Sequence, residues 1–266
     1  LNVIMYLQPG WFGIPDGSTA IRISFVTVSI WWAVFSIPVF LFVKEPKPTN
    51  SISVYRAISS GWKQLITTVR EIRHLKVVGL FLLAYWFYID GVDTIVRMAV
   101  SYGTDLGFDS SSLIVALLLV QFVAYPAALL YYRFANKVGV KSGIMYAIGG
   151  YSLTTLLAYF MSETWHFYSL AIMIALFQGG IQALSRSLYT RIIPIERSAE
   201  FFGFYNMFGK FAAIMGPFLM GYVTLIYDNP RFGILAILIL FVLGAFFLNK
   251  VDVQKGEQLA KANLVN

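Results

Sequence analysis

The sequence predicts an all-α integral membrane protein with several membrane-spanning helices. Hydrophobic residues make up 58% of the 266 residues and charged residues 12%, whereas soluble domains average about 45–50% and about 25%. The apolar residues come in runs of about 20, the length with which a helix crosses roughly 30 Å of hydrocarbon. Such runs are too long for barrel strands and lack their period of two. Helices are therefore the structure that satisfies the backbone polar groups in lipid.

Seven runs qualify as spans when the chain is followed in order. They cover residues 21–43, 76–101, 112–131, 143–161, 167–189, 200–226 and 231–249. Residues 1–7 are expected to end an earlier span. Residues 8–20, which are rich in glycine and proline, are predicted to form a loop. The chain opens on Leu1 without a signal peptide, so we expect it to start inside a longer protein.

The basic residues predict the orientation of the spans. Segments 44–76, 132–142, 186–200 and 250–266 hold sixteen of the 20 Lys and Arg residues, and the connections on the opposite side hold none. Positively charged loops remain in the cytoplasm. We therefore expect these four segments, and with them the C-terminus, to be cytoplasmic.

One connection, residues 44–75, is long and basic, whereas the other spans are joined by short turns. It opens with Glu-Pro-Lys-Pro, which cannot be helical because proline blocks a helix interior. After Ser53, apolar residues recur at helical spacing with basic residues among them. This pattern predicts an amphipathic basic helix on the cytoplasmic membrane face. An ordinary linker helix is the alternative.

Other features exclude several classes of protein. The net charge of +7 does not indicate nucleic-acid binding, because the basic residues form no continuous face. Without cysteine, disulfides and thiolate sites are excluded. His74 and His166 each lack a second ligand candidate, so no metal site is expected. No nucleotide-binding or nucleophile motif is present, and we expect no cofactor.

Beyond its first residue, the span predicted at 76–101 contains three charged residues, Asp90, Asp93 and Arg97. The two aspartates are three residues apart and share a helix face, and Arg97 is close enough to pair with Asp93. Charged residues within a span mark function by default. We expect carboxylates that face a cavity and carry a proton or contact a cationic group. The alternative is a structural Asp93–Arg97 pair, with Arg97 near the outer interface.

Two later spans carry polar residues at depth. Gln178 and Gln182 share one face of the span at 167–189, and they are expected to line the solute pathway or to bond neighbouring helices. The span at 200–226 contains Asn206 and Lys210.

A lysine about 15 Å inside a span must find a carboxylate, a carbonyl, water or an anionic ligand. Lys210 is therefore expected to contact solute or coupling ion, with structural pairing as the alternative. In the same span, Pro217 predicts a kink.

The turn after residue 131 reads Tyr132-Arg-Phe-Ala-Asn-Lys-Val-Gly-Val-Lys141. It resembles the conserved loop of the major facilitator superfamily, Gly-x-Leu-Ala-Asp-Arg-x-Gly-x-Lys. Tyr132 replaces the first glycine of that pattern and Asn136 its aspartate, which departs from the charge relay attributed to the loop. The resemblance implies a cytoplasmic gating loop made of Arg133, Asn136, Lys137, Gly139 and Lys141.

Longer segments resemble one branch of this superfamily. They are residues 179–194, 199–205 and 209–217, with Asp90-Gly91 and Arg97-Met98-Ala99. They look like the branch related to the vacuolar amino-acid effluxers of autophagy and their bacterial relatives. The resemblance implies the bacterial cytoplasmic membrane, or the vacuolar membrane in a eukaryote.

The resemblance also implies the domain organisation. Residues 1–43 would end an N-terminal half that is otherwise missing, and residues 44–75 would link the halves. Residues 76–249 would form the six-helix C-terminal half, followed by a cytoplasmic tail at 250–266. In this superfamily the first and fourth helices of each half line the central cavity, which here implies the helices carrying Asp90 and Gln178.

The leading interpretation is a secondary active or facilitative transporter of a small polar solute, with amino-acid efflux implied by the resemblance alone. Alternating access would arise by rocking one half against the other, with the bilayer, the solute, the other half and protons as partners. A membrane scaffold or receptor-like protein with the same fold is the alternative. An intramembrane enzyme would need catalytic groups on two helices. Here both aspartates are on one helix and neither histidine lies in a span, so we expect no catalytic residues.

Overall fold

The computed structural model describes residues 1–43 and 75–262, and all regular structure in them is helical. This confirms the predicted all-α class. The chain divides into two units, Leu1–Ser60 and Gly61–Asn266. The predicted linker with its amphipathic helix falls, apart from Leu75, outside the described residues.

The first unit contains α1 (Asn2–Leu7), the short 3₁₀ helix η1 (Pro9–Phe12) and α2 (Gly17–Phe42). Helix α2 begins four residues earlier than predicted, because Asp16 accepts hydrogen bonds from the Thr19 backbone N–H at 2.7 Å and from its hydroxyl at 3.1 Å. Such an N-cap satisfies a free amide of the first turn. The same bonds hold the pKa of Asp16 below its usual range. The predicted loop at 8–20 is therefore shorter than expected.

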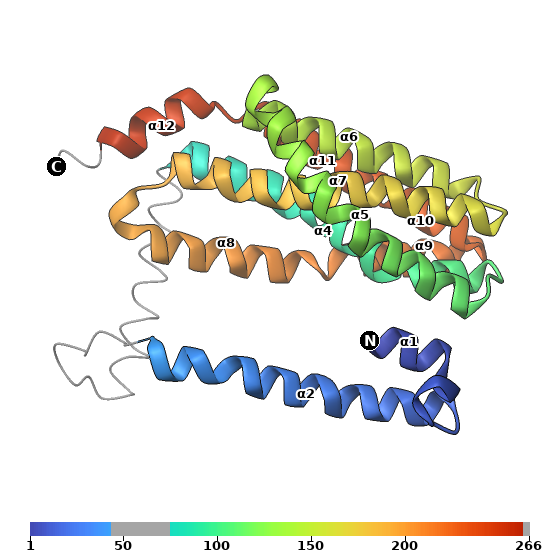
Figure 1. Ribbon diagram of the computed structural model, residues 1–266. Helices are drawn as coiled ribbons and strands as arrows, with labels where there is room; N and C mark the ends of the chain where they lie inside the picture. Colours follow the sequence, from blue (N-terminus) through green and yellow to red (C-terminus); the bar gives the residue numbers. More distant parts are fainter. Residues whose placement is uncertain (44–74, 263–266) are drawn as a thin grey trace, which may run out of the picture. The chain divides into compact units, whose positions relative to one another are not determined.

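The second unit is a bundle of helices, and α12 follows it at the C-terminal end (Figure 1). Its helices are α4 (Lys76–Asp105), α5 (Ser110–Val138), α6 (Val140–Tyr159), α7 (Thr164–Ile192), η2 (Ile195–Arg197), α8 (Ser198–Ala212), α9 (Met215–Tyr227), α10 (Pro230–Ala236), α11 (Leu238–Asn249) and α12 (Val253–Ala262).

In the described part of the chain, six helical segments, not seven, are long and apolar enough to cross a membrane. The exception is the predicted span at 143–161. It forms helix α6, but three glycines and several Ser, Thr and Tyr residues leave it without a stretch as apolar as those of the six candidate spans. Small and weakly polar residues allow close helix packing in membranes, and α6 lies against α7 and α11. The predicted span at 200–226 also differs, because it is divided into α8 and α9.

Large apolar side chains remain exposed along the helices. Phe40 of α2, Phe122 of α5 and Leu225 of α9 are 84%, 77% and 82% exposed. Large apolar side chains this exposed, on several long helices, are unusual in a soluble monomer. It fits helices whose outer faces contact hydrocarbon.

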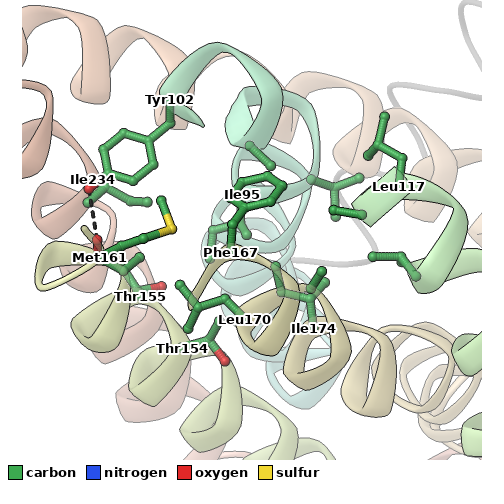
Figure 2. A pocket seen from close by; sticks show the side chains of 16 residues that line it. Ile95, Tyr102, Leu117, Thr154, Thr155, Met161, Phe167, Leu170, Ile174 and Ile234 are labelled. Carbon is green, nitrogen blue, oxygen red and sulfur yellow. Dashed lines mark hydrogen bonds between the residues drawn. The ribbon is translucent and has the colours of Figure 1, made fainter. Parts of the chain in front are cut away.

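A small apolar cavity of about 70 Å³ lies among α4, α5, α6, α7 and α10. Figure 2 shows its wall of Ile95, Phe167, Leu170 and Ile174 side chains. At its edge the Tyr102 hydroxyl donates to the Ala158 carbonyl at 2.8 Å, which ties the end of α4 to the end of α6. No charged side chain lines this cavity, so it is not where the predicted polar residues meet.

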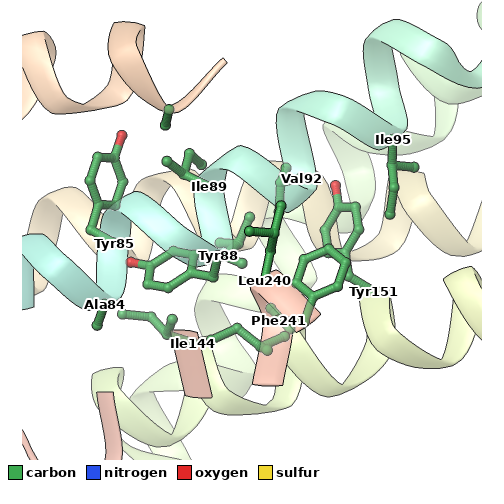
Figure 3. Packing of buried hydrophobic residues seen from close by; sticks show 14 of the residues in the cluster. Ala84, Tyr85, Tyr88, Ile89, Val92, Ile95, Ile144, Tyr151, Leu240 and Phe241 are labelled. Atoms are coloured by element: carbon green, nitrogen blue, oxygen red, sulfur yellow. The ribbon is translucent and has the colours of Figure 1, made fainter. Parts of the chain in front are cut away.

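Helices α4 and α11 approach closely through reciprocal glycines. A Cβ added at Gly244 of α11 would lie 2.9 Å from the backbone nitrogen of Tyr88, and one added at Gly91 of α4 would lie 2.8 Å from the Phe241 ring. Figure 3 shows the Phe241 side chain beside this stretch of α4. The α4 backbone at Tyr88 thus lies against Gly244, and the Phe241 ring lies against Gly91. Small residues promote helix association in membranes in this way.

We expect Gly244→Ala to lower the stability of the protein by about 1–3 kcal/mol, because the new methyl group meets the α4 backbone and overpacks the interface. Gly149→Ala is the matched control, since a Cβ there meets nothing within 4 Å. It should leave the thermal midpoint in detergent unchanged or raise it, because alanine favours helix by about 1 kcal/mol over glycine. Equal midpoints for the two variants would contradict this account of the α4–α11 contact.

Candidate functional site

Four of the predicted site residues meet at one cavity. Asp93, Gln182, Asn206 and Lys210 line a hollow of about 330 Å³ between α4, α7 and α8. The remaining lining residues are Tyr85, Ile89, Arg186, Tyr205 and Gly209. Helices that are far apart in sequence therefore bring these polar groups together.

Each of the three helices contributes residues four apart, which places them on one helix face. On α4 they are Tyr85, Ile89 and Asp93. On α7 they are Gln182 and Arg186. Helix α8 contributes two such pairs, Tyr205 with Gly209 and Asn206 with Lys210.

Aromatic rings form one wall of the cavity. Tyr85 stacks on Tyr205 with ring centroids 4.2 Å apart and an interplanar angle of 24°, and Tyr205 stacks on Tyr189 at 5.1 Å. Sequence reasoning missed Tyr85 and Tyr205 as site residues and placed Arg186 at the inner membrane surface. The available signal was helical spacing, because Tyr85 lies two turns before Asp93, Tyr205 one turn before Gly209 and Arg186 one turn after Gln182.

Opposite charges face this cavity without neutralising one another. Asp93 brings a carboxylate, and Arg186 and Lys210 bring cations. Among the residues that the structure describes, no ion pair joins Asp93 to either cation or to Arg97. The structural Asp93–Arg97 pair considered from the sequence is therefore not formed. Unpaired charges within a span must be satisfied by water or by a ligand.

The other predicted residues lie elsewhere. Arg97 is exposed and does not line the cavity. Gln178 is partly buried, and its side-chain oxygen has no hydrogen-bond partner in the described residues. Asp90 is only 1% exposed, and its carboxylate accepts from the Gly216 backbone N–H. The structure thus brings Asp93, but not Asp90, to the cavity.

The predicted gating loop is mostly helical. Arg133, Asn136 and Lys137 belong to α5, and Gly139 is the single residue between α5 and α6. Gly139 has φ 91°, a backbone conformation that favours glycine, and this permits the sharp reversal. Lys141 donates to the carbonyls of Asn249 and Val251, each at 2.8 Å, and so joins the start of α6 to the end of α11.

Behind the cavity, a hydrogen bond links α4 to α7. The Ser185 hydroxyl donates to the Ile181 carbonyl at 2.6 Å. It therefore accepts the hydrogen bond from the buried Tyr88 hydroxyl, 2.7 Å away. This contact fixes the two helices that carry Asp93 and Gln182.

Comparison with known proteins identifies the family. A family model described as "Vacuole effluxer Atg22 like" matches residues 1–261. The chain belongs to this Atg22-like family.

Named relatives agree with this assignment. The MFS-type transporter YxiO of Bacillus subtilis is 40% identical over 87% of this chain and 54% of its own length. Autophagy-related protein 22 of Yarrowia lipolytica is 26% identical over 93% of this chain and 47% of its own. Autophagy-related protein 22-1 of Aspergillus fumigatus is 29% identical over 91% of this chain and 44% of its own.

These matches confirm the resemblance stated from the sequence, the branch of the major facilitator superfamily that joins autophagy effluxers to bacterial relatives. The Atg22-like chain is a multi-pass membrane protein of a transporter family rather than an enzyme. It spans about half the length of the curated relatives that it matches.

We expect Ser185→Ala to lower the free energy of unfolding by about 1–3 kcal/mol, because it leaves the Tyr88 hydroxyl buried without an acceptor. Adding Tyr88→Phe should recover part of this loss, since it removes the unsatisfied group. Thermal unfolding of the single and double variants in detergent measures both effects.

The control is Ser152→Ala, because the Ser152 hydroxyl bonds only the Ile148 carbonyl of its own helix, at 2.8 Å. Its midpoint should stay near that of the unchanged protein. A double variant that is less stable than Ser185→Ala alone would contradict the proposed direction of the Tyr88–Ser185 bond.

Proposed function

We propose that this Atg22-like chain is part of a secondary transporter that moves a small polar solute by alternating access. The proposal rests on one observation. Three helices present unpaired charges of opposite sign and a tyrosine wall to one cavity. At about 330 Å³, the cavity falls within the usual range for a small-molecule site, about 300–1,000 Å³.

The charges favour a zwitterion such as an amino acid. Asp93 would bind an ammonium group, and Arg186 and Lys210 would bind a carboxylate. Gln182 and Asn206 offer hydrogen bonds to the same solute. The family description names vacuole effluxers, which supports export as the direction. Asp93 is the carboxylate that faces the cavity, so it is the residue we propose for proton coupling.

We further propose that residues 76–249 are the C-terminal half of the transporter and that residues 1–43 end the preceding half. The match to about half of each relative supports this. Rocking of the two halves around the cavity would then expose it to each side of the membrane in turn.

Contacts within the bundle support the proposed sidedness. Lys141 joins the start of α6 to the end of α11, and Arg191 of α7 lies 3.9 Å from Glu257 of α12. These basic helix ends therefore lie at one end of the bundle. Following the positive-inside rule, we propose that this end and the C-terminus are cytoplasmic. The identity to the Bacillus subtilis relative favours a bacterial cytoplasmic membrane.

Counterflow uptake of labelled amino acids into proteoliposomes, with and without a pH gradient, tests the proposal on the full-length protein. We expect uptake, and we expect Asp93→Asn and Lys210→Met each to reduce it at least about tenfold, because losing one partner of a desolvated charge contact costs about 2 kcal/mol or more. Asp93→Asn should also abolish any stimulation by the pH gradient.

Two variants serve as matched controls. Asp105→Asn removes a carboxylate from the same helix as Asp93, and Lys255→Met removes an exposed lysine from α12. Neither residue lines the cavity, so both variants should transport normally. Unchanged uptake in both Asp93→Asn and Lys210→Met would show that the cavity does not lie on the solute path. No uptake from folded protein across a broad panel of solutes would favour the scaffold alternative.

A further inference from the structure

We propose that Asp90 is a positioning residue. Its carboxylate holds the break between α8 and α9 and thereby fixes Lys210 of α8 opposite Asp93 of α4. The consequence for transport builds on the proposed function, whereas the contact itself does not.

The broken span leaves backbone groups without helical partners. Helix α8 ends at Ala212 and α9 begins at Met215, and the two follow one another along the bundle (Figure 1). The first amides of a helix have no acceptor within it, and the residue that precedes α9 provides no side-chain cap. In hydrocarbon each unsatisfied amide costs several kcal/mol. Pro217 reduces the number of amides that need an acceptor by one, because proline has no backbone N–H.

Asp90 supplies the missing acceptor from a different helix. Its two carboxylate oxygens lie 3.0 and 3.1 Å from the Gly216 backbone nitrogen. Thr94, one turn further along α4, donates to the same carboxylate at 3.4 Å. A negative group at a helix N-terminus is also favoured by the helix dipole. Asp90 therefore acts as an N-cap for α9 across 126 residues of sequence.

The close approach of α4 to α9 depends on Gly216. A Cβ at this position would lie 1.8 Å from the Thr94 hydroxyl oxygen and 3.0 Å from an Asp90 carboxylate oxygen. Asp90 and Thr94 are both essentially inaccessible. Only glycine fits here, so the backbone of α9 is held directly against the Asp90 side chain.

This contact determines the geometry of the cavity. Lys210 stands three residues before the break, and Asp93 stands three residues after Asp90. Both line the cavity, and Asp90 does not. Fixing the break against α4 therefore fixes the separation of the ammonium and the carboxylate that we propose to bind solute.

A hydrogen-bond acceptor is all that this role requires. An asparagine at position 90 can keep its side-chain oxygen at the Oδ1 position, which accepts from both Gly216 and Thr94, so it should preserve these contacts without charge. A leucine has a similar size but leaves the Gly216 amide unsatisfied. The role thus differs from that of a proton carrier, for which asparagine would be as harmful as leucine.

Transport kinetics of the full-length protein test the inference. We expect Asp90→Asn to keep the apparent KM, the maximal rate and the pH profile within about threefold of the unchanged protein, a difference below that of one buried hydrogen bond. Asp90→Leu should raise the apparent KM about tenfold or more, as expected for the loss of one buried hydrogen-bond partner. Asp93→Asn is the matched control on the same helix and should reduce uptake at least about tenfold, as proposed above.

A second measurement does not depend on transport. The chain has no cysteine, and Ala212, at the break, is 0% exposed. The test uses purified full-length protein bearing Ala212→Cys as its sole cysteine. A thiol reagent should label this cysteine slowly, and adding Asp90→Asn should leave the labelling rate unchanged. Adding Asp90→Leu should speed the reaction about tenfold, because the break loosens.

The outcomes separate the two proposals. Loss of transport in Asp90→Asn, or fast labelling of the thiol at position 212 in that variant, would overturn the positioning role. Unchanged labelling and KM in Asp90→Leu would also overturn it. If Asp90→Leu does not fold, the uptake of Asp90→Asn compared with that of Asp93→Asn decides whether Asp90 has the positioning role. If no solute is transported at all, the proposed function fails, whereas the labelling rates still test Asp90.

Discussion

The need to satisfy every backbone amide inside hydrocarbon governs this structure. It explains why all described regular structure is helical, and it makes the interruption between α8 and α9 costly unless its free amides find acceptors. The cost is met by a carboxylate on α4, since Asp90 accepts from Gly216. One cross-helix contact thus stabilises a broken span and lets α8 end beside the cavity, with Asn206 and Lys210 on its inner face.

Helix α4 contacts several neighbouring helices at once because its faces carry different residues. Tyr88 packs over Gly244 of α11 and donates to Ser185 of α7. Asp90 contacts α9, and Asp93 faces the cavity. Residues one to three positions apart are rotated around the helix axis by about 100° per residue, so a short stretch of α4 reaches several partners. This explains why α4 is the most buried of the candidate spans.

The candidate site is polar where the surrounding bundle is apolar. The 70 Å³ cavity in Figure 2 is lined by aliphatic and aromatic groups, whereas the 330 Å³ cavity gathers charges from three helices. The family match places the chain among transporters. The charged residues of the larger cavity are the groups that we propose bind the transported solute. Because the chain spans about half of its relatives, the cavity described here is one wall of the proposed pathway.

The sequence by itself determined the helical class, most of the spans and the polar residues within them, because hydropathy and helical spacing are local properties. It predicted the helix at α6, although the small and polar residues of α6 leave it less apolar than a candidate span, and it treated the α5–α6 turn as a loop. Only the tertiary structure decided how Asp90 and Asp93 differ. They stand three residues apart on one helix, yet one faces the α9 backbone and the other a cavity. Their partners on other helices lie more than 80 residues away, where no local pattern could indicate which side chain meets which helix.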